Sequence, residues 1–150
     1  MRKVKRTKYG DYELRVKFPV FRGYTIHIVI GEDLENSIQA RYPEHLESED
    51  DQHTSAMTIK AVENDTHIFL TESDIFRPYE IANILAHEVW HAVRAMLLHI
   101  GSSVTGTDET TNEVVAYHLG FTIERATQFI DGVIHDIRSR ATKAAKRRNR

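Results

Sequence analysis

Four runs of residues in the first half of the chain have the pattern of β-strands. Apolar and charged residues alternate along Tyr12–Phe18, which is the period of a strand with one buried face. β-branched and aromatic residues dominate 24–30, 56–62 and 66–70. The residues Glu63-Asn64-Asp65 between the last two runs are suited to a hairpin turn. We therefore expect four short strands.

The second half of the chain changes to a period of three to four residues, which predicts two long helices. The first runs from Pro78 to His99 and stops before Gly101. The second begins at Thr107 or Asp108 and continues to about Ile137. A block of strands followed by two helices predicts an α+β fold, in which a small, mostly antiparallel sheet packs against the two helices.

A short helix and a polar loop are expected between the second and third strands. Residues 32–41 begin with acidic side chains, which favour the start of a helix. Residues 43–53 are acidic and polar, so we expect a loop that leaves His45 and His53 in solvent.

The composition is that of one globular domain. The chain has 150 residues, of which 41% are hydrophobic and 28% charged. It contains no cysteine, which excludes disulfides and cysteine-based zinc sites. No apolar run approaches the roughly 20 residues of a membrane helix, and the basic N-terminus leads into no secretory signal. We therefore expect no membrane partner and a cytoplasmic protein.

The net charge of −2 conceals a strong asymmetry. Residues 1–10 form a basic N-terminal segment with five Lys and Arg, and residues 138–150 form a basic tail with seven. These 12 cations leave 8 of the chain's 20 for residues 11–137, which also hold all 22 acids and so carry a net charge of −14. An acidic domain between two basic ends suggests nucleic acid as one partner of the tails.

The first long helix contains His-Glu-x-x-His, formed by His87, Glu88 and His91. Residues four apart lie on one face of a helix, so both imidazoles can reach one metal ion. Glu88 projects beside that ion, where a general base for a metal-bound water must lie. The alternative is a pair of histidines with a purely structural role in the core.

Catalytic zinc usually has three protein ligands and an open position for water. Glu113 is the best candidate for the third ligand, because the second helix should pass antiparallel to the first and bring its early turns near His91. His99 lies about 12 Å from His91 along the helix axis, too far for a shared ion. Three weaker alternatives for the third ligand are Asp108, Glu109 and His118.

At these residues the chain resembles the gluzincin branch of the zincin metallopeptidases. That family combines the His-Glu-x-x-His motif with a glutamate one helix later, which here is Glu113 within the NExxA pattern of Asn112–Ala116. The resemblance implies that His87, His91 and Glu113 bind zinc and that Glu88 is the general base. It also implies a sheet whose edge strand holds an extended peptide, for which Thr66–Leu70 is the candidate.

The resemblance rests on sequence motifs within residues 80–120. In outline the chain is also similar to minimal, phage-like intracellular zincins. The metzincin pattern is absent, because Leu97 stands where a third histidine is required. Many gluzincins have an acid four residues after the glutamate, where this chain has Tyr117. The Tyr117 hydroxyl can stabilise an oxyanion if it faces the site, or the ring can pack between the helices.

The expected function is therefore zinc-dependent hydrolysis of a protein or peptide substrate through a metal-bound water, with Glu88 as general base. One alternative is a nucleic-acid-associated protease similar to SprT-like enzymes, which the basic tails suggest. Another is a non-catalytic binding or inhibitor protein that uses zinc for stability.

Overall fold

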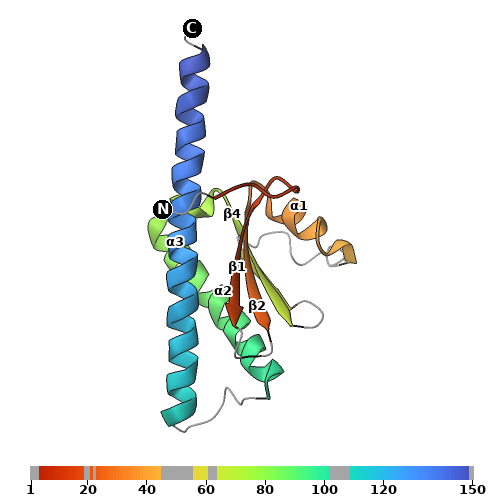
Figure 1. Ribbon diagram of the computed structural model, residues 1–150. Helices are drawn as coiled ribbons and strands as arrows, with labels where there is room; N and C mark the ends of the chain where they lie inside the picture. The colour runs from red at the N-terminus through yellow and green to blue at the C-terminus, as the bar shows by residue number, and fades with distance from the viewer. Residues whose placement is uncertain are drawn as a thin grey trace.

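The α+β fold expected from the sequence is confirmed. The computed structural model describes residues 4–18, 21, 23–44, 56–60, 64–101 and 109–148, and Figure 1 shows their arrangement. The elements follow in the order β1 (Tyr12–Phe18), β2 (Tyr24–Gly31), α1 (Leu34–Gln39), β3 (Ala56–Lys60), β4 (Asp65–Thr71), the 3-10 helix η4 (Asp74–Phe76), α2 (Pro78–His99) and α3 (Glu109–Arg148). α2 and α3 cover one face of the sheet, and α1 packs on the other.

The predicted elements are found within a few residues of their expected bounds. β1 and α2 have the predicted bounds, and α1 occupies the middle of the expected 32–41 helix. β3 ends at Lys60, and 61–63 lie outside the described residues. The expected loop is described only as far as residue 44, so His45 and His53 also lie outside the described residues.

The strand order in the sheet corrects one expectation. The order is β1-β2-β4-β3, with β1 and β3 antiparallel to their neighbours and β2 parallel to β4. Thr66–Leu70 therefore lies in an interior strand, and the prediction that it forms the edge was wrong. β4 pairs with β2 on one side and with β3 on the other, which places β3 at the edge of the sheet. This edge strand contacts α2.

Two apolar clusters lie on the two faces of the sheet. The larger one joins the sheet to α2 and α3, and its helical members include Leu85, Val89, Val93 and Met96. The smaller one lies between the sheet and α1. Every residue of β2 is buried, because this strand is paired on both sides and covered on both faces.

α3 is one continuous helix that runs past the expected end near Ile137 to Arg148. Its side chains from 141 to 148 are all exposed, and Figure 1 shows this end of the helix extending beyond the rest of the molecule. Within the ranges given above, no helix is long and apolar enough to cross a membrane.

Candidate metal centre

The two motif histidines converge on the surface of α2. The Nε2 atoms of His87 and His91 lie 3.1 Å apart, and the rings meet nearly edge to face at 77°. The side chain of His87 is 67% exposed, and His91 is also exposed. Spacing by four residues on a helix produces this convergence, because it places both side chains one turn apart on the same face.

Glu88 is turned from the histidines toward the sheet. It is only 8% exposed, because one step along a helix rotates its side chain by about 100° toward β3. Thr58 Oγ1 donates a hydrogen bond of 2.5 Å to Glu88 Oε2, and Glu88 Oε1 lies 4.0 Å from His87 Nε2. The edge strand thus fixes one carboxylate oxygen and leaves the other next to the histidine pair.

A shallow groove of about 360 Å³ joins these residues to the edge strand. Its lining comes from β3 and α2, namely Ala56, Met57, Thr58, Lys60, His87, Glu88, His91 and Ala95. Among the described residues β3 pairs only with β4, so the backbone on the groove side of β3 has no strand beside it. In the part of the chain that the structure describes, the histidines therefore lie beside an unpaired sheet edge.

The geometry of the pair fits two ligands of one zinc ion. Two nitrogens bound to tetrahedral zinc at about 2.0–2.1 Å lie about 3.3 Å from each other, close to the observed 3.1 Å between His87 and His91. A third ligand is not found beside them, because no group of three His, Cys, Asp or Glu side chains within the described ranges can hold a metal ion.

Glu113 is not brought to the histidine pair. Its side chain is exposed on α3, and the buried face of that helix carries His118, about 140° away around the axis. α3 packs on α2 and β1, whereas the groove lies at β3, three strands across the sheet from β1. The antiparallel packing of α2 and α3 is present (Figure 1), but no residue of α3 is among those that line the groove. The proposed role of Glu113 as a ligand stays a prediction.

Tyr117 and His118 belong to an aromatic group at the β1 end of the sheet. Tyr117 is 68% exposed and stacks on Phe121, with 6.4 Å between ring centroids. His118 is buried with its ring edge against Phe18 and Phe21, and burial lowers its pKa. Neither residue lines the groove.

The remaining alternatives for the third ligand cannot be placed. Asp108 lies outside the described residues, and of Glu109 only the backbone is described. Each stays a prediction.

A second histidine pair on the opposite face of the sheet was not expected from the sequence. His27 and His67 stack across the parallel strands β2 and β4, with 4.2 Å between ring centroids. His27 Nδ1 lies 2.9 Å from Glu13 Oε1, and the Tyr42 hydroxyl lies 2.6 Å from His67 Nδ1. Only the register of β2 against β4 brings these histidines together, and nothing in the local sequence predicts that register.

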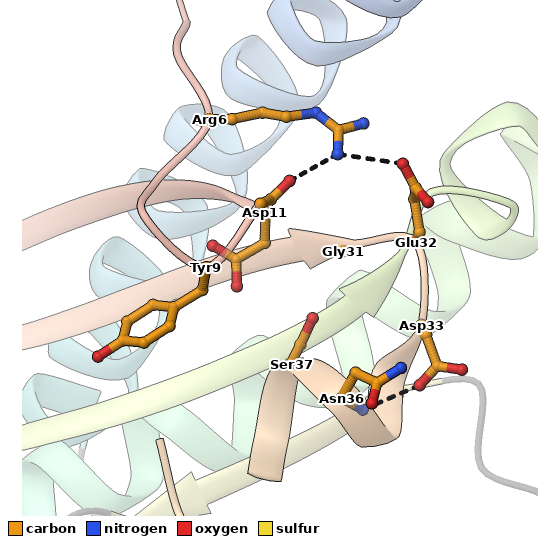
Figure 2. A pocket seen from close by; sticks show the side chains of 9 residues that line it. Arg6, Tyr9, Asp11, Gly31, Glu32, Asp33, Asn36 and Ser37 are labelled. Atoms are coloured by element: carbon orange, nitrogen blue, oxygen red, sulfur yellow. Dashed lines mark hydrogen bonds and ion pairs between the residues drawn. The ribbon is translucent and has the colours of Figure 1, made fainter. Parts of the chain in front are cut away.

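A second hollow, of about 250 Å³, lies beside α1 (Figure 2). Its charged groups are paired with one another: Arg6 donates to the Gly10 carbonyl at 2.6 Å and lies 3.1 Å from Glu32. Asp11 is held by Arg41 at 2.6 Å. This hollow offers no converging free ligands, so the groove beside β3 is the stronger candidate site.

No family model matches this chain, and neither a curated protein nor a solved structure matches it.

Proposed function

We propose that this protein is a zinc-dependent metallopeptidase that hydrolyses peptide bonds in the groove between α2 and β3. The observation that carries the proposal is the convergence of the His87 and His91 Nε2 atoms next to the Glu88 carboxylate at a free sheet edge. A zinc site with a purely structural role does not require a nearby carboxylate that is held in place without binding the ion.

His87 and His91 are the proposed zinc ligands. Their spacing agrees with one shared ion, and their exposure leaves room for water and substrate. Zn²⁺, when held by these imidazoles, polarises a substrate carbonyl and makes a water molecule easier to deprotonate near neutral pH.

Glu88 is the proposed general base. It accepts the proton of the attacking water and then passes it to the leaving amine. The hydrogen bond from Thr58 to Oε2 holds the carboxylate in one orientation, so that Oε1 remains free on the side of His87. Because Glu88 is largely buried, this orientation is not averaged over many rotamers.

The free edge of β3 is the proposed binding surface for the substrate. An extended peptide can add to a sheet edge through backbone hydrogen bonds, which give affinity without a fixed sequence. β3 lines the same groove as His87 and Glu88, so a peptide bound there would pass directly over the histidine pair.

Replacing Glu88 by Gln tests this proposal. The amide keeps the size of the side chain and can still accept from Thr58, but it cannot accept the proton of water. We expect hydrolysis of denatured casein and of a fluorogenic peptide library to fall by about 10²–10⁴-fold while bound zinc, measured by elemental analysis, is unchanged.

The matched control is Glu80→Gln, which changes an exposed glutamate in the first turn of the same helix and should leave hydrolysis unchanged. Undiminished hydrolysis by the Glu88→Gln variant would overturn the assignment of the base. Zinc binding without hydrolysis in the unaltered protein would instead favour a non-catalytic, zinc-stabilised binding protein.

A further inference from the structure

The C-terminal end of α3 is a strongly basic surface. We define the basic arm as residues 138–148, which contain six Lys and Arg and no acid. Figure 1 shows that this end of α3 extends beyond the sheet and the other helices. All side chains from 141 to 148 are exposed, so the arm presents its charge on every side.

The base of the arm is anchored, but its outer half has no partner in the described structure. Arg140 pairs with Asp136 at 2.7 Å, and Arg138 lies over the ring of Phe76. Beyond residue 141 the described residues provide no ion pair or ring contact for the four remaining cations, which are Lys143, Lys146, Arg147 and Arg148.

The structure also brings the two basic ends of the chain together. The guanidinium groups of Arg6 and Arg140 both lie over the ring of Tyr12, at 5.2 and 5.9 Å from its centroid. The N-terminal cations therefore add to the positive charge at the base of the arm. The body between the two ends carries a net charge of −14, so a large anion would be repelled by the body and attracted to this end.

Burial does not explain why the arm is helical. It contains alanine as its only aliphatic residue type, and its side chains from 141 to 148 are all exposed. Alanine, lysine and arginine are good helix formers, and the helix is already nucleated by its docked part. However, Lys143 with Lys146 and Lys143 with Arg147 are like-charge pairs three and four residues apart, which weaken a helix until an anion neutralises them.

We propose that the basic arm binds double-stranded DNA by lying in the major groove. B-form DNA admits an α-helix there, and phosphates on both sides of the groove can meet cations on several faces of the arm. A membrane surface fits less well, because a membrane-binding helix requires an apolar face that this arm lacks. Double-stranded RNA also fits less well, because its major groove is too narrow for a helix.

The test is binding of the full chain to a fluorescent 20-base-pair DNA duplex, measured by anisotropy. We expect affinity to fall by roughly 100-fold or more between 50 and 200 mM salt, since about four to six phosphates would be neutralised. The combined variant Lys143→Gln, Lys146→Gln, Arg147→Gln should bind at least about tenfold more weakly and reduce the slope of log affinity against log salt by about 3.

The matched control removes three exposed cations from the body, by Lys17→Gln, Arg94→Gln and Arg125→Gln. It should bind DNA within about twofold of the unaltered chain. Circular dichroism of both variants checks that the helix content is retained, since glutamine is also a good helix former.

Equal DNA binding by the arm variant and the unaltered chain would overturn the proposal. So would tighter binding to duplex RNA, or binding to phosphatidylserine vesicles without binding to DNA. These measurements do not depend on hydrolysis, so they stand apart from the proposed peptidase activity.

Discussion

The molecule contains two close pairs of histidines that differ in what their nitrogens can do. His87 and His91 meet edge to face on the exposed side of α2, with their Nε2 atoms 3.1 Å apart. His27 and His67 lie flat against each other across two strands, and their Nδ1 atoms are engaged by Glu13 and Tyr42. The first pair directs two lone pairs to one point, whereas the second stacks its ring faces.

The difference shows that closeness of histidines does not by itself make a metal site. Stacked rings direct their in-plane lone pairs side by side and not toward a common centre. The sheet pair instead belongs to a ring stack that continues to Phe69, and the ring of Tyr42 packs nearly perpendicular to that of His67. We therefore expect the helix pair to govern metal binding and the sheet pair to govern stability.

The largest expected effect is on zinc affinity. His91→Ala removes one of two converging nitrogens and should weaken zinc binding by on the order of 100-fold or more, because loss of even an outer-shell partner costs 10–100-fold. His67→Phe keeps the ring stack on the other face and should leave zinc affinity unchanged. Competition with a chromogenic chelator measures both, and equal loss in the two variants would contradict the distinction.

The next effect is on acid stability. Burial, followed by the neighbouring charges of His27 and Arg41, lowers the pKa of His67 to about 4 from an unperturbed 6.5, although Glu13 and Asp65 act in the opposite direction. The unfolded chain therefore takes up a proton before the folded chain does. Stability should decrease as pH falls from about 6.5 to about 4, by about 2 kcal/mol after allowance for solvent screening.

Thermal melting of the unaltered chain and of His67→Phe across that pH range measures this contribution. The variant should lose the part of the pH dependence that lies above pH 4. Glu13 acts at lower pH, because hydrogen bonds from Arg15 and His27 outweigh burial and lower its pKa to about 2. An unchanged slope between pH 6.5 and 4 in the variant would rule out His67 as the source.

A smaller effect is expected at Thr58, which we regard as a positioning residue for Glu88. Thr58→Val keeps the shape of the side chain but removes the hydrogen bond to Oε2, so kcat should fall by about tenfold with zinc content unchanged. Thr58→Ser returns the hydroxyl and should restore kcat, and failure of that rescue would count against a positioning role.

The smallest effect is expected at Glu113. Because this side chain is exposed on α3 and does not join the histidine pair, Glu113→Gln should keep zinc affinity within about twofold. The chelator competition used for His91 measures it. A large loss would show that α3 turns or moves when zinc binds, and it would support Glu113 as the third ligand.

Local sequence signals predicted α2 well and α3 less well. Pro78 and Gly101 mark the two ends of α2, and the apolar stripe between them selects its buried face. On α3 the expected end near Ile137 was too early, because alanine, lysine and arginine continue the helix to Arg148 without an apolar face. The packed face of α3 also contains the polar residues His118 and Thr122, which hydrophobicity alone does not predict.

The sequence by itself determined the elements, the pairing of His87 with His91 and the position of Glu88, because all of these follow from spacing along one chain segment. Tertiary structure alone decided that β3 and not β4 is an edge strand, that α3 packs on α2 and β1, and that His27 meets His67. Each of these depends on how separate elements pair and rotate. Pairing and rotation minimise exposed apolar surface over the whole molecule, so no short motif encodes them.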